Sequence, residues 1–319
     1  MGVGEQVQAA DTELEIATLD AGLDDVTRKS YRYLRVSVVA LAALLSLSLA
    51  IEIVLGGRET FGSISGYFYS PVRSIFVGAL VAIGPALISI KGRAGWEDTL
   101  LDLAGMLAPV VALVPTPLPD SREDVECAAG VAKCIPPEFV ASVENNIAAL
   151  AVLGAIGLVF AWLSAGRTVR QEAATRYGLA AAMVTWAVFV VTFLAAPEFF
   201  MSVAHYSAAI PLFLLVAAVA YLNGRRAPAR RHVAVMTPRG YGRAYRTISG
   251  LMILTLVLTG CYFAATAAIG ATPWFATTFA VEAVLLVLFV VFWVLQTAEN
   301  WREEAVAEQA ATGEDVATT

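Results

Sequence analysis

The chain has 319 residues, of which 58% are hydrophobic and only 15% are charged, and its mean hydropathy is +0.71. A soluble domain carries roughly 25% charged residues, so this composition excludes a soluble globular protein and indicates one helical membrane domain over nearly the whole chain. The net charge of −6 comes largely from acidic segments at residues 1–27 and 303–314, and therefore carries no information about an acidic or basic partner.

The N-terminal segment does not have the pattern of a signal peptide. Residues 1–27 contain acidic residues and no basic ones, whereas a signal peptide begins with a basic segment followed by an apolar run. The first apolar run begins near Val36 and is therefore expected to stay in the membrane. We expect residues 1–30 and 301–319 to be disordered acidic tails in the cytoplasm, on either side of a membrane domain at residues 31–300.

Eight apolar runs are long enough, at about 20 residues each, to cross a bilayer as helices. A spanning segment must be helical or belong to a closed barrel, since only these satisfy their own backbone hydrogen bonds in hydrocarbon. Unbroken apolar runs, without the alternation of barrel strands, favour helices. The sequence therefore predicts an all-α polytopic integral membrane bundle of about eight transmembrane helices. The expected spans are residues 36–55, 72–90, 98–114, 145–165, 177–196, 204–222, 247–268 and 275–297.

Two features of these spans concern helix packing. Gly84 and Pro85 should kink the second span, because proline removes a helical hydrogen bond. Ala104 and Ala108 lie one turn apart in the third span and form a small-residue pair that lets neighbouring helices approach closely.

Basic residues set the expected orientation. With the N-terminus inside, 17 of the 21 Lys and Arg residues fall on the inner side and 4 on the outer side, in agreement with the positive-inside rule. Tryptophans are expected at the water boundaries, with Trp96, Trp162 and Trp293 on the inner side and Trp274 on the outer side. The sequence predicts a multi-pass protein of the bacterial inner (plasma) membrane with both termini in the cytoplasm.

The cysteines agree with this orientation. Cys127 and Cys134 fall in the polar loop after the third span, which the orientation places in an oxidising compartment, so we expect a disulfide between them. Cys261 lies within the seventh span and is expected to be a small buried hydrophobic residue.

Ionisable groups inside a membrane are costly, and they are therefore candidate functional residues. Several of them fall at one depth, in the outer third of the predicted bundle, together with two tyrosines. This convergence predicts a polar cavity in the outer leaflet. The candidate ligand-binding residues are Glu52, Tyr67, Tyr69, Arg73, His205 and Glu282. Further polar residues at the same level are Ser70, Asn145, Asn146, Tyr206 and Ser207.

Each candidate has a functional and a structural interpretation. Arg73 would bind an anionic head group, because its planar guanidinium matches phosphate or carboxylate. His205, paired with Glu52 or Glu282, would move a proton. In the structural alternative these residues lie at the water boundary, and Arg73 pairs with Glu52 to hold the first two spans together. The sequence leaves both interpretations open.

A secondary candidate pair lies at the inner side. Asp98 and Asp102 share one face of the third span, four residues apart. Asp98, with Glu97 beside it, is expected at the water boundary, where it can meet Arg93 or the basic loop at residues 225–246. A structural ion pair is the alternative to a functional role for Asp102.

Familiar catalytic and cofactor motifs are absent from the sequence. It contains no P-loop, no GxGxxG, no HExxH and no GxSxG, and it has only two histidines, His205 and His232. A zinc site with three histidines and bis-histidine haem ligation are therefore excluded, and we expect no metal and no cofactor. The basic loop at residues 225–246 would fix topology or attract anionic lipid.

Residues 63–116 resemble a group of bacterial multi-spanning membrane proteins of unknown function. The shared features are a Ser-Ile-Ser and paired Tyr before an Arg, then FVGALVAIG, a basic linker, Glu-Asp, and AGMLA followed by VALVPT. HYSAA at residues 205–209 and FWVLQTAENW at 292–301 are similar to later parts of the same pattern. The resemblance implies a shared fold and no established activity.

A more distant similarity is to the alkaline ceramidase and adiponectin-receptor superfamily. That superfamily is identified by Ser, Asp and three His residues around zinc. This chain offers Ser70, Asp102 and His205, so the metal centre cannot be assembled.

The leading functional hypothesis is a protein, not an enzyme, that binds or transports an amphiphilic or anionic small molecule or lipid through the outer polar cavity. One alternative is a metal-independent intramembrane hydrolase or transferase in which His205 activates Ser70 or Ser207. Another is a structural partner in envelope assembly. Membrane lipid is an expected partner and nucleic acid is not, and the sequence leaves the oligomeric state open.

Overall fold

The computed structural model is almost entirely helical. It describes residues 3–56, 61–90, 95–119, 125, 127, 131–166, 172–227 and 236–312, with side chains described at 26–27 and, within those ranges, at 29–301. The helices are α1 (Val3–Leu55), α2 (Arg73–Ser89), α3 (Trp96–Leu113), α4 (Pro137–Ala165), α6 (Ala173–Ala195), α7 (Pro197–Arg226), α8 (Pro238–Ala268) and α9 (Thr277–Thr312). The remaining elements are the 3-10 helix η1 (Ser65–Tyr69) and the short strands β1 (Leu118–Pro119) and β2 (Lys133–Cys134).

Every predicted span falls within one of these helices, give or take a few residues at its ends, which confirms the all-α polytopic membrane bundle. Six helices in the described part of the chain are long and apolar enough to cross a membrane. They are the Lys29–Leu55 part of α1, α4, α6, α7, α8, and the Thr277–Trp301 part of α9. Of the other two, α2 is apolar but has only 17 residues, and α3 carries acidic residues near its start. Both pack inside the bundle, where α2 contacts α1 and α3, and α3 contacts α7.

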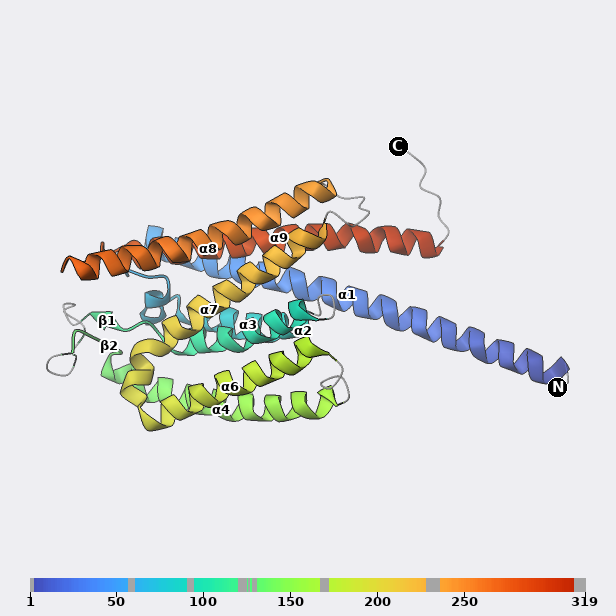
Figure 1. Ribbon diagram of the computed structural model, residues 1–319, viewed down its shortest axis with the longest axis horizontal. Coiled ribbons are helices and arrows are strands. Elements are labelled where there is room, and N and C mark those ends of the chain that lie inside the picture. Colours follow the sequence, from blue (N-terminus) through green and yellow to red (C-terminus); the bar gives the residue numbers. More distant parts are fainter. Residues whose placement is uncertain are drawn as a thin grey trace.

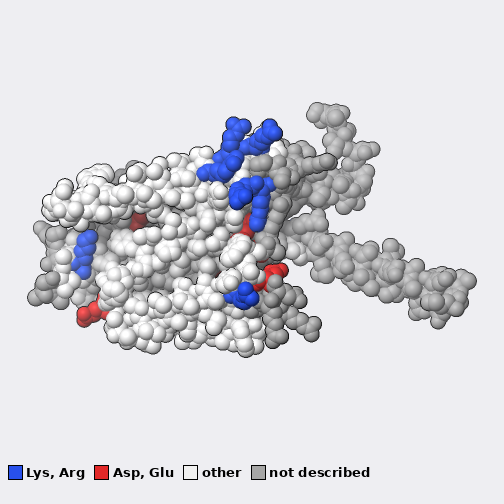
Figure 2. Space-filling view, viewed as in Figure 1, with Lys and Arg blue, Asp and Glu red and all other residues white. Residues whose placement is uncertain are grey.

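The bundle has two distinct ends. η1, β1 and β2 lie at one end, which we call the disulfide end (Figure 1). α1 and α9 project beyond the opposite end, where α7 finishes with Arg225 and Arg226 (Figure 1). Lys and Arg side chains gather mainly there, so we call it the basic end (Figure 2). α7 and α8 pack together near the basic end and diverge toward the disulfide end (Figure 1).

Two glycines bring α2 and α3 into direct backbone contact. A Cβ atom added at Gly84 would lie 2.8 Å from the Gly105 carbonyl oxygen, and one added at Gly105 would lie 2.5 Å from the Gly84 carbonyl oxygen. Ala104 and Ala108, the predicted small-residue pair, are fully buried. Small residues therefore set the distance between these two helices, as they commonly do in membrane bundles.

A disulfide closes the loop between α3 and α4. Cys127 and Cys134 are joined, with their Cα atoms 5.7 Å apart, as the sequence predicted. Cys134 lies in β2, which pairs antiparallel with β1, so the bridge reinforces a two-stranded ribbon that covers the disulfide end.

The terminal segments differ from expectation, since α1 begins at Val3 and α9 ends at Thr312. Most of the two segments that we expected to be disordered is thus helical and continuous with a span. α1 has no proline between its ends, and Ala, Leu and Glu favour helix, so nothing local stops the helix at the membrane boundary.

For two residues, Trp293 and Cys261, the exposure in the structure is the opposite of the one predicted from the spans. Trp293 was predicted at a water boundary, but it is fully buried in the protein core, whereas Trp96, Trp162 and Trp274 are exposed. Cys261 was predicted to be buried, but it lies exposed on α8. In a membrane both faces of a span are apolar, so hydrophobicity does not tell which face meets lipid and which meets protein.

Replacing Gly84 with alanine is expected to lower the free energy of unfolding by about 1–3 kcal/mol, because the new methyl group would collide with α3. Gly78→Ala in the same helix is the matched control, since a Cβ there meets no atom within 4 Å. Thermal unfolding of both variants in detergent, followed by circular dichroism, compares them directly. Equal midpoints would contradict the close contact.

Candidate functional site

The segment between α1 and α2 folds back into the bundle and is not exposed at its surface. Within it, Ile64, Tyr67 and Phe68 are at most 6% exposed. They pack against apolar side chains of α1, α2 and α9 in one core cluster. The short helix η1 therefore brings polar atoms of residues 61–72 among the helices at the disulfide end.

Glu282 of α9 accepts hydrogen bonds from this segment. Its Oε2 atom lies 2.5 Å from the Ile64 amide nitrogen and 3.3 Å from that of Ser65. Its Oε1 atom accepts a hydrogen bond from the Ser65 hydroxyl at 3.0 Å. The carboxylate thus satisfies amides at the start of η1, which have no partner within the short helix itself.

Further hydroxyl groups surround Ser65. Its Oγ atom is hydrogen-bonded to Thr116 Oγ1 and lies 3.3 Å from Ser63 Oγ. The Tyr206 hydroxyl of α7 interacts with the Thr116 side chain and lies within electrostatic reach of Glu282. We call Glu282, Ser63, Ser65, Thr116 and Tyr206 the Glu282 cluster.

Arg73, the first residue of α2, lies against aromatic rings. Its guanidinium carbon is 4.6 Å from the ring centre of Phe68 and 5.0 Å from that of Phe139. Ring faces stabilise a cation without using its N–H donors. Among the described residues, no carboxylate forms an ion pair with Arg73, so the expected structural pair with Glu52 is not formed. Arg73 is half-buried.

The paired tyrosines join the two parts of the site. The Tyr69 hydroxyl donates a hydrogen bond to the Thr116 carbonyl at 3.2 Å. Burial raises the pKa of Tyr69, and the charge of the nearby Arg73 opposes that rise. Tyr67 packs edge-on against Phe61 at 5.1 Å between ring centres. Tyr67 also lies within electrostatic reach of Glu52. Both tyrosines therefore remain neutral hydrogen-bonding groups.

His205 does not form the proton-transfer pair that the sequence suggested. It is 2% exposed, and its Nδ1 atom lies 2.8 Å from the Val114 carbonyl oxygen. A carbonyl oxygen only accepts, so Nδ1 carries a proton. Neither Glu52 nor Glu282 pairs with it in the described part of the chain. His205 therefore fixes α7 to the end of α3.

The two candidate nucleophiles are also separate from His205. The Ser70 hydroxyl bonds to the Tyr67 carbonyl oxygen at 2.8 Å. Ser207 is exposed on α7. Within the described residues no serine bonds to His205, so the arrangement required by the hydrolase hypothesis is not assembled there.

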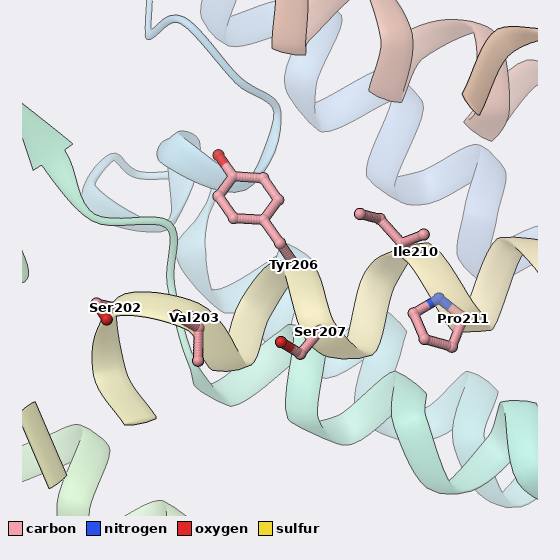
Figure 3. Close-up of a pocket in the computed structure, with 6 residues that line it drawn as sticks. All are labelled: Ser202, Val203, Tyr206, Ser207, Ile210 and Pro211. Carbon is pink, nitrogen blue, oxygen red and sulfur yellow. The ribbon is translucent and has the colours of Figure 1, made fainter. Parts of the chain in front are cut away.

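A groove runs along α7 beside the Glu282 cluster. Its volume is about 380 Å³. Tyr206 stands at its edge and points away from the α7 axis toward the fold-back segment (Figure 3). The space-filling view shows a hollow at this end between α7 and α8, with acidic atoms at its floor (Figure 2). The groove is lined by Ser202, Val203, Tyr206, Ser207, Ile210 and Pro211.

The basic end holds a directly paired carboxylate. Glu97 is 3% exposed and accepts hydrogen bonds from Arg226 and Asn223, each at 2.8 Å. The acidic start of α3 thus meets the basic segment after the sixth predicted span, as expected. Glu97 makes this contact, whereas Asp98 has a buried oxygen without a hydrogen-bond partner among the described residues.

The secondary candidate Asp102 is half-buried, one turn beyond Asp98 on α3. The described residues contain no group of three His, Cys, Asp or Glu side chains arranged to bind a metal. His232 and Arg93 lie outside the described residues. The described ion pair at this end is that of Glu97 with Arg226, and a functional role for Asp98 or Asp102 stays a prediction.

Sequence reasoning missed the hydroxyl group of Ser65, which binds the Glu282 carboxylate, and the hydroxyl groups of Ser63 and Thr116, which contact Ser65. Ser63, Ser65 and Thr116 carry no charge, and they fall in segments predicted to lie outside the spans. The only signal was their presence in the Ser-Ile-Ser and VALVPT parts of the quoted resemblance. Their convergence depends on the fold-back of residues 61–72, for which hydropathy gives no sign.

Replacing Glu282 with alanine is expected to lower the free energy of unfolding by about 1–3 kcal/mol, because two amides lose their acceptor. Hydrogen exchange at Ile64 and Ser65 should accelerate in the same variant. Glu144→Ala on the exposed face of α4 is the matched control. Unchanged exchange at Ile64 and Ser65 in the Glu282 variant would show that the carboxylate does not hold the segment.

Comparison with known proteins identified no relative of this chain. No protein-family model, no curated protein and no solved structure matches the chain. The resemblance of residues 63–116 to other bacterial membrane proteins therefore remains a prediction from the sequence.

Proposed function

We propose that the protein is an inner-membrane protein that binds or transports an amphiphilic, anionic small molecule or lipid at its disulfide end. In this proposal both termini lie in the cytoplasm and the disulfide end faces outward. The observation that carries the proposal is the position of Arg73. Its guanidinium lies against the rings of Phe68 and Phe139, with no carboxylate partner among the described residues.

The chemistry of Arg73 supports an anionic head group. A guanidinium presents N–H donors in a planar fork that matches phosphate or carboxylate. The rings of Phe68 and Phe139 contact the guanidinium without accepting a hydrogen bond from it. A half-buried cation without a protein counter-ion is costly inside a bundle, and a bound anion would remove that cost.

The groove on α7 supports an apolar tail. Val203, Ile210 and Pro211 line it, and the helix around it belongs to a membrane-spanning segment. Its volume is about 380 Å³, and because all of its lining residues lie on α7 it is an open groove along one helix and not an enclosed pocket. An amphiphile could place its tail in this groove and its head group among the polar residues at the same end.

Two features support the outward orientation. The disulfide between Cys127 and Cys134 requires an oxidising compartment, which a bacterial cell provides outside the inner membrane. Lys and Arg gather at the opposite end, as they do on cytoplasmic sides (Figure 2).

The orientation is tested with fusion reporters. Alkaline phosphatase fused after Val131 should be active, because it requires an oxidising compartment to fold. Green fluorescent protein fused to the C-terminus should fluoresce, because that end is expected to remain in the cytoplasm. An inactive phosphatase with a non-fluorescent C-terminal fusion would reverse the orientation and remove the outer-leaflet site.

Ligand binding is tested with dodecyl phosphate titrated into the purified protein in neutral detergent by calorimetry. Arg73→Gln is expected to weaken binding about tenfold, through loss of a charge-assisted hydrogen bond worth about 1.4 kcal/mol. Arg243→Gln, an exposed position at the basic end, is the matched control. Equal binding by the wild type and both variants, or equal loss in both, would contradict an Arg73 site.

A further inference from the structure

The Glu282 cluster forms a continuous row of hydroxyl groups. Thr116 Oγ1 is hydrogen-bonded to Ser65 Oγ, and Ser65 Oγ donates to Glu282 Oε1 at 3.0 Å. The Tyr206 side chain, at the edge of the groove, interacts with the Thr116 side chain and extends the row toward the groove (Figure 3). The row connects three separate parts of the chain, namely α7, the segment after α3, and η1, and it ends on a carboxylate of α9.

The hydrogen bonds of this row have one consistent direction. An ionised carboxylate only accepts, so Ser65 must donate its single proton to Glu282. Ser65 then accepts from Thr116, and in a relay that starts at the groove Thr116 would accept from Tyr206. Ser63 lies beside the row, because its Oγ atom accepts from the Gly66 amide at 2.9 Å and is 3.3 Å from Ser65 Oγ, a longer contact than the 3.0 Å between Ser65 Oγ and Glu282 Oε1. Ser65 and Thr116 therefore each donate once and accept once along the row, which is the arrangement that allows a proton to pass.

The two oxygens of Glu282 have different tasks. Oε2 accepts the amides of Ile64 and Ser65 and thereby holds η1. Oε1 faces the Ser65 hydroxyl at the end of the row. A proton on Oε1 would leave Oε2 free to keep accepting those amides, so the fold of η1 survives a change in the charge of Glu282.

The surroundings contain few other charges. α7 contributes Tyr206 and His205, whose ring centres are 5.4 Å apart. η1 contributes Tyr67 and Tyr69, α1 contributes Glu52 near Tyr67, and α4 contributes Glu138 within electrostatic reach of Tyr69. α2 contributes Arg73, within electrostatic reach of Tyr69. Within its membrane-spanning half, residues 247–268 of α8 carry no Asp, Glu, Lys, Arg or His. Among the described residues no cation pairs with Glu282, and its hydrogen-bond donors are neutral, namely the amides of Ile64 and Ser65 and the Ser65 hydroxyl.

We propose that Glu282 is a proton-binding site of this protein, loaded from the α7 groove through the hydroxyl relay Tyr206–Thr116–Ser65. The relay conserves atoms and charge. Ser65 gives its proton to Glu282 Oε1 and receives one from Thr116, Thr116 receives one from Tyr206, and Tyr206 receives one from water or a protonated group in the groove. One proton leaves the groove and one O–H bond forms on Glu282.

The assignment makes the site responsive to protons as well as to an anionic ligand. It does not rest on the identity of that ligand, because proton binding can be measured with none present. Failure of the relay would therefore leave the Arg73 proposal standing, and failure of Arg73 binding would leave the relay standing.

The experiment is time-resolved infrared spectroscopy after a pH jump, on the full chain in nanodiscs of zwitterionic lipid. The wild type should show a carboxylic-acid carbonyl band that Glu282→Gln abolishes and Glu144→Gln retains. The amide oxygen of the introduced glutamine can still accept from the two backbone amides, so the Glu282→Gln variant is expected to fold. Glu282→Asp keeps a carboxyl group and should shift the band instead of removing it.

The relay itself is tested by rate. Tyr206→Phe and Thr116→Val should leave the size of the band unchanged but slow its appearance at least about tenfold, because the proton loses its path. Tyr262→Phe is the matched control, since its hydroxyl lies at the same end and bonds to the Trp274 amide, outside the relay. A full band in Glu282→Gln would overturn the site, and wild-type rates in both relay variants would overturn the relay.

Discussion

The fold-back of residues 61–72 imposes the constraint on which the disulfide end depends. Inside an apolar bundle no water satisfies a backbone amide that leaves helical geometry, so each such amide needs an acceptor from the protein. Glu282 supplies one for Ile64 and Ser65. In return, the Phe279 amide of α9 donates to the Gly62 carbonyl at 2.9 Å. α9 and the segment thus fix each other, and the polar residues that the segment carries take their positions from this contact.

Acidic and basic side chains are paired at one end of the bundle and separated at the other. At the basic end Glu97 meets Arg226 at 2.8 Å, and each charge is balanced by its neighbour. Such a pair holds α3 against α7, and its charges are already neutralised by each other, so they would bind a charged ligand only weakly. At the disulfide end the acidic and basic groups are kept apart, with Glu282 bonded to neutral donors and Arg73 held by aromatic rings. Neither charge neutralises the other, so in the two proposals above Arg73 can bind an anion and Glu282 can bind a proton.

Hydropathy predicted the spans because a helix that crosses a bilayer must be apolar over about 20 residues. The disulfide was predicted from the expected orientation, which places Cys127 and Cys134 in an oxidising compartment. The site was predicted only in part. Charged residues at a common depth indicated the end of the bundle where the structure places Arg73, Glu282 and the paired tyrosines, since the cost of burying a charge is visible in the sequence. The partners of those charges were not visible, because His205 bonds to a backbone carbonyl and Glu282 to backbone amides and small hydroxyls. Such contacts depend on the fold-back of residues 61–72 and on which face of each helix points into the protein. The apolar sequence of a span predicts neither of these. Trp293, which was expected at a water boundary and is fully buried, is an example.

The two proposed sites meet at the segment that holds η1. The ring centre of Phe68 in η1 lies 4.6 Å from the Arg73 guanidinium carbon, and the amides of Ile64 and Ser65 at the start of η1 donate to Glu282. An anion that moved Arg73 would therefore act on Glu282 through the same short helix. By thermodynamic linkage such an effect is reciprocal, so a proton on Glu282 would change the affinity for the anion by the same factor. The neutral hydroxyls of Ser65 and Thr116 suit either state of Glu282, because they can donate toward an ionised carboxylate or accept from a protonated one.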